Sequence, residues 1–347
     1  ATSIELEIED GLMVGDSTII KAYINATGDV IFIVDGVDAV VPIKDGVASV
    51  YLTNLAAGDH MVDVIFLETD LYLGSDASGT LKVSKWNSTI SASADGIEVG
   101  QNATVVVTLP SDATGKVVVD GKYSADIIDG VANVVVPGLT QNATLTVVYD
   151  GDDKYLGNET SVDVVVSKVS EYNMTVNVSS ADGKITVDVE LPADATGNVT
   201  VTTPEGNQTV PVEDGKATAV ISDVSAGETD VNITYSGDDK YNPQTTAQSV
   251  NATKKDSVLS GEQLIMFVKD GSKFTVTLTD SSGKAIAGKV VKINIVGKTY
   301  NRTTDENGTA SLDINLNAGS YAVSAVYPGD EEYNVSNVVE TSVEVYT

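Results

Sequence analysis

The sequence predicts an all-β protein built from repeated small β-sandwich domains. Hydrophobic residues make up 42% of its 347 residues but aromatic residues only 5%. The apolar residues are mostly Val, Ile and Ala, and Val, Ile and Thr suit strands while Gly and Asp suit tight turns. No segment shows a sustained 3.6-residue apolar period, so almost no helix is expected.

A short acidic segment between two aromatic residues marks the repeats. It reads YDGDDKY at 149–155, YSGDDKY at 235–241, YPGDEEY at 327–333 and, in a divergent form, FLETDLY at 66–72. The second aromatic residue is Tyr72, Tyr155, Tyr241 or Tyr333, and these positions are 83, 86 and 92 residues apart. Such a period is too long for a solenoid and fits whole small domains in tandem. The predicted domains are 1–85, 86–168, 169–254 and a longer variant, 255–347.

The second repeat shows the strand pattern most clearly. Seven short apolar or alternating runs fall within about 80 residues, with Asp-Gly turns at 120–121 and 129–130 among them. This spacing is typical of an immunoglobulin-like sandwich. We therefore expect four tandem immunoglobulin-like domains arranged as an elongated rod, the fourth with an added hairpin. The cysteine pair and core tryptophan of antibody domains are missing, and Trp86 is predicted to pack at an interdomain joint.

The acidic segment 149–155 invites three interpretations, namely a metal loop, a catalytic carboxylate pair or a turn. Comparison of the four segments favours a turn, because only the central acid of the last three recurs, as Asp152, Asp238 and Asp330. Alternation along the hairpin directs Tyr149 to one face and leaves the aspartates in solvent. Tyr155 is predicted to fold back as a cap on the sandwich.

Charge and cysteine content exclude several classes of function. The chain carries 50 acidic and 20 basic residues, a net charge of −30, which disfavours nucleic acid and anionic membrane surfaces as partners. It has no cysteine, which excludes disulfides, thiol catalysis and zinc knuckles. No run of about 18 apolar residues exists, so no membrane insertion is expected within this segment. Since the chain starts at Ala1 without a signal peptide, we expect a mature or excised piece of a longer protein.

Fourteen of the 21 asparagines lie in Asn-X-Ser/Thr sequons, where chance would give about four. Such an excess favours a glycosylated, extracellular protein. The candidate acceptors are Asn25, Asn87, Asn102, Asn142, Asn158, Asn173, Asn177, Asn198, Asn207, Asn232, Asn251, Asn301, Asn307 and Asn334.

No residue pattern indicates catalysis, so we expect a protein that is not an enzyme. The single histidine, His60, has no second histidine or cysteine beside it and is interpreted as a solvated turn residue. Carboxylates occur everywhere, which makes no pair of them informative, and small sandwiches offer few clefts for a glycosidase-type pair.

Two stabilising devices stay open as alternatives. Calcium is the only cofactor considered, because Asp-rich loops supply hard oxygen ligands, although 6–8 oxygens must converge. Its candidate ligands are Asp152, Asp153, Asp238, Asp239, Asp330 and Glu331. The second device is an isopeptide bond in the fourth repeat between Lys273 and Asn337, which would leave an intact mass lower by one ammonia.

The chain resembles the tandem immunoglobulin-like domains of archaeal, methanogen-type adhesin-like surface proteins. The resemblance rests on the VxYxGDxxY endings, on GEQLIMFVKDGSKFTVTLTD at 261–280 and on GKTYNRTTDENGTASLDINL at 297–316. It implies an extracellular, cell-surface adhesin or adhesin stalk segment that binds, or presents a binding region to, a glycan, protein or envelope polymer of another cell. The alternatives are a purely structural envelope or spacer component, and a carbohydrate-binding or spacer array of a secreted enzyme.

Overall fold

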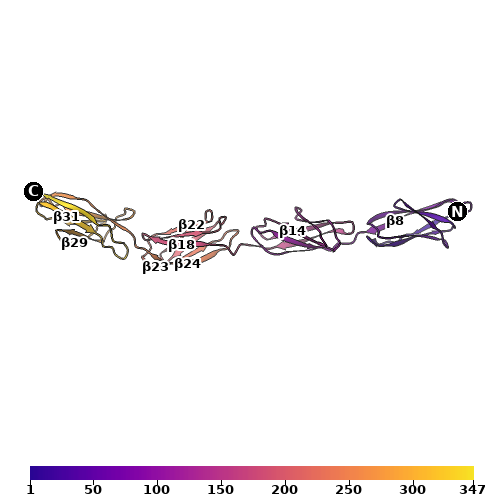
Figure 1. The fold of residues 1–347 in the computed structure, drawn as a ribbon, viewed down its shortest axis with the longest axis horizontal. Helices are drawn as coiled ribbons and strands as arrows, with labels where there is room; N and C mark the ends of the chain where they lie inside the picture. Colours follow the sequence, from indigo (N-terminus) through magenta and orange to yellow (C-terminus); the bar gives the residue numbers. More distant parts are fainter. The chain divides into compact units, whose positions relative to one another are not determined.

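A computed structural model describes residues 1–347 and confirms the all-β, immunoglobulin-like fold, with 32 strands and no helix (Figure 1). No helix could therefore cross a membrane. The chain divides into two compact units, Ala1–Ser167 and Lys168–Thr347. The four-domain count and the rod stay predictions.

The first repeat folds as two facing sheets, with strand orders β1-β3-β6 and β2-β8-β7-β4-β5. All its pairs are antiparallel except β2 with β8. Every second residue of β3 is buried, which places Ile20, Ala22 and Ile24 in the core. The strands are β1 (Ile4–Glu7), β2 (Leu12–Met13), β3 (Thr18–Ile24), β4 (Asp29–Val34), β5 (Val37–Pro42), β6 (Val47–Leu52), β7 (Gly58–Phe66) and β8 (Ser75–Ser84).

The second repeat has sheets β14-β11-β9 and β13-β12-β15-β16 and a parallel pair, β10-β17. Its predicted turns at 120–121 and 129–130 are confirmed, since Asp120, Gly121, Asp129 and Gly130 all have positive φ. The strands are β9 (Ser91–Ala94), β10 (Ile97–Glu98), β11 (Ala103–Thr108), β12 (Lys116–Val119), β13 (Tyr123–Asp126), β14 (Val131–Val136), β15 (Ala143–Gly151), β16 (Leu156–Val164) and β17 (Val166–Ser167).

The third repeat has sheets β18-β19-β22 and β21-β20-β23-β24, all antiparallel. The long hairpin β23-β24 pairs nine residues on each strand. The strands are β18 (Thr175–Ala181), β19 (Lys184–Glu190), β20 (Asn198–Thr203), β21 (Gly206–Pro211), β22 (Lys216–Ile221), β23 (Gly227–Tyr235) and β24 (Gln244–Ala252).

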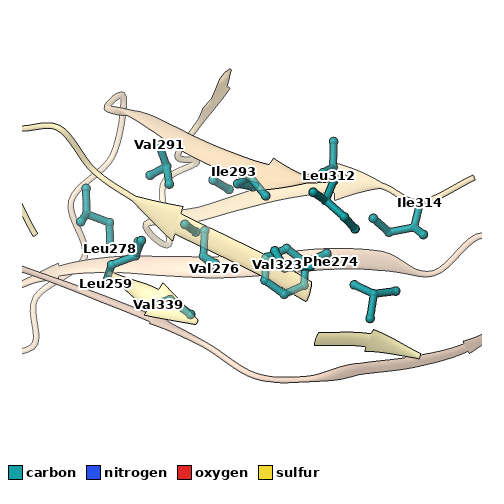
Figure 2. Packing of buried hydrophobic residues seen from close by; sticks show 14 of the residues in the cluster. Leu259, Phe274, Val276, Leu278, Val291, Ile293, Leu312, Ile314, Val323 and Val339 are labelled. Atoms are coloured by element: carbon teal, nitrogen blue, oxygen red, sulfur yellow. The ribbon is translucent and has the colours of Figure 1, made fainter. Parts of the chain in front are cut away.

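The fourth repeat has sheets β25-β27-β30 and β26-β32-β31-β28-β29. Figure 2 shows Val276 and Leu278 of β27 and Val291 and Ile293 of β28 among its core side chains. Relative to the third repeat it has one further strand, β26, which pairs parallel with β32. After β27, Thr279 and Ala285 form an antiparallel bridge across a tight turn, and the added hairpin stays a prediction. The strands are β25 (Ser257–Gly261), β26 (Leu264–Phe267), β27 (Lys273–Asp280), β28 (Val290–Ile295), β29 (Lys298–Thr303), β30 (Thr309–Asp313), β31 (Gly319–Val326) and β32 (Val339–Tyr346).

The buried apolar side chains form four clusters, and the members of each lie within one repeat. Their members span residues 12–83, 103–164, 185–252 and 259–345. Burial of valine and isoleucine side chains, at about 25 cal/mol per Å² of apolar surface, therefore stabilises each repeat from within.

Candidate functional site

The acidic segments of the last three repeats form loops of one kind, which we call the Asp-Tyr loops (residues 150–155, 236–241 and 328–333). The tyrosine before each loop closes the core: Tyr149, Tyr235 and Tyr327 are at most 2% exposed. Tyr149, which alternation directs to one face of the hairpin, therefore lies on the face that packs into the core.

The glycine of each loop has no room for a side chain. Gly151 has a φ of 89°, and a Cβ there would lie 2.6 Å from the carbonyl oxygen of Tyr155. Gly237 and Gly329 are in the same left-handed region, and a Cβ at either would come within 3.0 Å of backbone atoms across the loop. The loops can close this tightly only with glycine at this position.

The aspartate after the glycine organises the loop, and the prediction that all the aspartates lie in solvent is wrong for Asp152. Its Oδ1 accepts hydrogen bonds from the backbone N–H groups of Lys154 (2.8 Å) and Tyr155 (2.7 Å). Its Oδ2 accepts from the backbone N–H (2.8 Å) and hydroxyl (3.1 Å) of Thr114, which belongs to a neighbouring loop. One carboxylate therefore both closes the Asp-Tyr loop and joins it to the loop before β12.

The third repeat reproduces this arrangement. Asp238 accepts from the backbone N–H groups of Lys240 (2.8 Å) and Tyr241 (2.7 Å), and from the backbone N–H of Thr196 (2.7 Å). In the second repeat, Lys154 forms an ion pair with Asp112, and the hydroxyl of Tyr155 donates to the same carboxylate. In the third repeat, Lys240 and Tyr241 contact Asp194 in the same way.

In the fourth repeat a lysine replaces the threonine. Asp330 accepts from the backbone N–H groups of Glu332 (2.8 Å) and Tyr333 (2.9 Å), while Nζ of Lys289 lies 2.6 Å from its Oδ2. Oδ1 of Asp330 therefore still accepts from the loop backbone, and its Oδ2 accepts a charge-assisted hydrogen bond from the lysine where the other repeats have a threonine.

Each Asp-Tyr loop also binds the residues that lead into its repeat. The N–H of Trp86 donates to the carbonyl of Lys154 (2.9 Å), and the N–H of Leu156 donates to the carbonyl of Trp86 (2.8 Å). Val169 and Lys255 make the same pair of backbone bonds in the next two repeats. The incoming chain is therefore paired as a one-residue parallel bridge beside the tyrosine.

A lysine immediately before that bridge secures the incoming chain further. Nζ of Lys85 donates to the carbonyl of Asp152, that of Lys168 to the carbonyl of Asp238, and that of Lys254 to the carbonyl of Asp330. We call each Asp-Tyr loop, with the lysine and bridge residue bound to it (85–86, 168–169 or 254–255), a linker clamp. The prediction that Trp86 packs at a joint is consistent with its indole N–H, which donates to the carbonyl of Val14 at 3.0 Å.

The first repeat closes its loop differently. Thr69 stands where the others have the central aspartate, and its hydroxyl accepts from the N–H of Tyr72 at 3.1 Å. Its N–H donates to the carbonyl of Tyr72 at 2.9 Å, as in the Asp-Tyr loops. The turn therefore forms in the divergent repeat as well, with a hydroxyl doing what a carboxylate does elsewhere.

Hydrogen bonds to the ionised form set the acidity of the central aspartates. Burial alone would raise the pKa of Asp152, but the backbone N–H groups of Thr114, Tyr155 and Lys154 outweigh it and lower the pKa from 3.8 to about 2. The pKa of Asp238 is lowered to about 2 in the same way. Because the folded pKa is the lower one, this stabilisation is complete above about pH 4 and is lost as the pH falls towards 2.

The calcium candidates do not form a ligand cluster. No group of three or more His, Cys, Asp or Glu side chains is arranged to hold a metal ion. Asp153, Asp239 and Glu331 are exposed, and the carboxylates of Asp152, Asp238 and Asp330 accept the hydrogen bonds described above. These oxygens would have to give up N–H donors before they could coordinate a cation.

Calcium is accordingly expected to leave the stability of the chain unchanged. Melting curves of the 347-residue chain in chelated buffer and in 5 mM calcium, roughly the range of weak extracellular sites, should superimpose. A calcium-dependent rise in the melting temperature would contradict this expectation, and its loss in Asp153→Asn but not in Asp163→Asn would place the calcium site in the Asp-Tyr loop.

The fourteen sequon asparagines are all exposed. Two of them bond residues that lie just beyond a linker clamp: Nδ2 of Asn158 donates to the carbonyl of Ser88 (2.7 Å), and Nδ2 of Asn334 donates to Oδ1 of Asp256 (2.9 Å). Exposure meets the first requirement of an acceptor set, and the use of these sequons stays a prediction.

Lys273 and Asn337, the residues of the isopeptide hypothesis, do not pair with each other. Nζ of Lys273 lies 3.2 Å from Asp313, on a side chain that is 55% exposed. The amide of Asn337 instead bonds the backbone N–H and carbonyl of Leu259. The hypothesis of a bond between these two residues is therefore wrong.

The interpretation of His60 as a solvated turn residue is wrong. It lies in β7, with Nδ1 2.6 Å from Oδ2 of Asp35 and Nε2 2.9 Å from the carbonyl of Ala56. Both ring nitrogens face acceptors, so the imidazolium, which donates from both, is the form that fits. The carbonyl of Ala56 and the carboxylate of Asp35 raise the pKa of His60 above 6.5.

The first repeat is therefore expected to lose stability as the pH rises through the folded pKa of His60. Because the folded pKa is the higher one, the stabilisation is complete below pH 6.5. Amide exchange of β7 in the full chain, measured between pH 6 and 9 and corrected for intrinsic rates, should show this loss, and His60→Gln should remove it. A pH-independent opening free energy in the unaltered chain would refute the imidazolium assignment.

A family model for a bacterial Ig-like domain (group 3) matches residues 267–346, which are 80 of the 347 residues. The match covers most of the fourth repeat and supports the immunoglobulin-like fold there. No curated protein matches the sequence.

Three solved structures illustrate what the chain is similar to. A Ca2+-stabilised adhesin of an Antarctic bacterium that binds ice is 16% identical, with 99% of each chain covered and a TM-score of 0.31. A 1.5-MDa bacterial ice-binding adhesin is 17% identical over 76% of this chain and 99% of the other, with a TM-score of 0.26. A tandem of titin domains is 12% identical over 72% and 98%, with a TM-score of 0.31. At such low values, the function of this chain has to be argued from its own residues.

Proposed function

We propose that this chain is a segment of a cell-surface adhesin or adhesin stalk of the archaeal, methanogen type, whose repeats mediate or present attachment to another cell. The observation that carries the proposal is the linker clamp, which occurs three times with the same backbone bridge and the same lysine-to-carbonyl bond. A device that fixes the entering chain to each repeat serves a protein that transmits tension along tandem domains.

Two further features support an extracellular setting. All fourteen sequon asparagines are exposed, as glycan acceptors must be, and a net charge of −30 keeps a surface protein soluble and repels nucleic acid. The resemblance at 261–280 and 297–316 supports the archaeal assignment, whereas the family model matching 267–346 is a bacterial one.

The partner would be a glycan, protein or envelope polymer, bound through many weak contacts whose effects multiply in a tandem array. A purely structural stalk is the second candidate, and the clamps favour it equally, because they order the chain without binding a ligand. We infer no catalytic role, since the clamp carboxylates are engaged in backbone capping.

Binding of the fluorescently labelled 347-residue chain to whole cells, with a glycan array beside it, tests the adhesive role. Saturable binding to cells that an unlabelled excess displaces would support an adhesin. Absence of binding in both assays would leave the stalk, and an intracellular location of the native protein would overturn both.

A further inference from the structure

The fourth repeat contains a cleft of about 230 Å³ that the linker clamps do not use. It lies between the edge strand β29 and the segment that follows β30 in the opposite sheet. Its apolar walls are formed by Ile295, Leu312, Ile314 and Leu316. Tyr300 and Arg302 of β29 also line it.

The charge around this cleft differs from that of the whole chain. Residues 281–304, which include β28 and β29, contain five basic and no acidic residues, whereas the chain carries −30. Only Lys289 among the five has a carboxylate partner. Two of the five, Lys298 and Arg302, line the cleft, and neither has a carboxylate partner.

Arg302 is the only arginine of the chain, and it lies on the cleft without an ionic partner. Its guanidinium carbon is 5.6 Å from the centre of the Tyr300 ring, and Nη1 donates to the carbonyl of Asn301 at 2.8 Å. Asp313, the one acid that lines the cleft, pairs with Lys273 instead. A guanidinium has five N–H donors in a fork that matches a carboxylate, so most of its donors have no acceptor in the protein.

These features define the chemistry of a ligand. The ring of Tyr300 and the aliphatic walls suit the apolar face of a small ring, and Arg302 and Lys298 suit one carboxylate. The volume falls below the roughly 300–1,000 Å³ of ordinary ligand pockets, so a single ring-sized group fits better than an extended segment.

We propose that this cleft binds a carboxylated sugar residue, a uronic acid unit of an acidic cell-surface polysaccharide. The inference rests on the proposed adhesive function and deepens it, since it names the class of polymer. Edge-strand pairing with an acidic peptide is the less fitting occupant, because the sequon Asn301 lies in the middle of β29, where a glycan would obstruct an added strand.

Calorimetric titration of the full chain tests the proposal, with trigalacturonate as the probe and a neutral galactose trisaccharide and pentaglutamate as comparators. Of the three compounds, only trigalacturonate should bind. Arg302→Gln should weaken it by about tenfold or more, and Arg302→Lys by less, because lysine keeps the charge but loses the fork. Lys292→Gln, which removes the same charge from the same hairpin outside the cleft, should change the affinity less than twofold.

No binding of trigalacturonate, equal binding of the neutral sugar or pentaglutamate, or an equal loss in Lys292→Gln would each overturn the site. Unchanged amide exchange of β28 and β31 in each variant establishes that the fourth repeat stays folded. Failure here is distinguishable from failure of the adhesin proposal, because binding of the unaltered chain to whole cells is a separate measurement that does not presuppose a uronic acid ligand.

Discussion

The variant Asp152→Ala is expected to lose about 2–4 kcal/mol of stability from the second repeat, the cost of leaving several N–H donors without an acceptor. Asp152 accepts from the backbone of Lys154, Tyr155 and Thr114, and the methyl group of alanine replaces none of these bonds. Amide exchange of β11 and β15 in the full chain measures the effect, since a global melting curve merges repeats that need not unfold together.

The neighbouring acid supplies the matched control. Asp153→Ala removes the same charge from the next position, where the side chain is exposed, and should change stability by less than about 0.5 kcal/mol. Equal effects of the two substitutions would mean that the charge of the loop matters and the capping bonds do not.

The variant Gly151→Ala should destabilise the second repeat by about 3 kcal/mol or more, because strain and a steric clash add. Its Cβ would lie 2.6 Å from the carbonyl oxygen of Tyr155 and 2.7 Å from the N of Gly157, both on the segment that returns across the loop. Relief requires the loop to open, which also breaks the bridge to Trp86. The same exchange measurement should therefore show faster exchange at Trp86 as well as in β15.

Gly138→Ala separates the two contributions. Gly138 has a φ of 78°, close to the 89° of Gly151, but a Cβ there meets nothing within 4 Å. It should cost only the backbone strain, about 1 kcal/mol. A Gly138→Ala effect as large as that of Gly151→Ala would show that backbone strain alone explains the loop glycine.

The fold follows from patterns that are local in the sequence. Alternation in β11 and β14 and the Asp-Gly pairs at 120–121 and 129–130 specify strands and hairpins within a few residues of each other. The turn at 149–155 and the inward direction of Tyr149 are predictable for the same reason. The position of His60 was not, because its ring is held by Asp35, which lies 25 residues away.

The linker clamp depends on contacts too distant for pattern analysis. Lys85 meets Asp152 across 67 residues, and Asp152 meets Thr114 across 38. The signals were nevertheless present, since the central aspartate and the boundary lysine recur at Asp238 and Lys168 and at Asp330 and Lys254. Recurrence indicated that these residues matter, but only the structure shows that they contact one another.

The central claim is that the Asp-Tyr loop fixes the residue that enters each repeat, and the amide exchange of Trp86 against that of Asn87 tests it most directly. The N–H of Trp86 donates to the carbonyl of Lys154, whereas the N–H of Asn87, the next residue, has no backbone or side-chain acceptor in the structure. We expect Trp86 to exchange about a hundredfold or more slower than Asn87 after correction for intrinsic rates, a difference of roughly 3 kcal/mol in local opening. Equal exchange at the two amides would show that the linker is not clamped and would contradict the account.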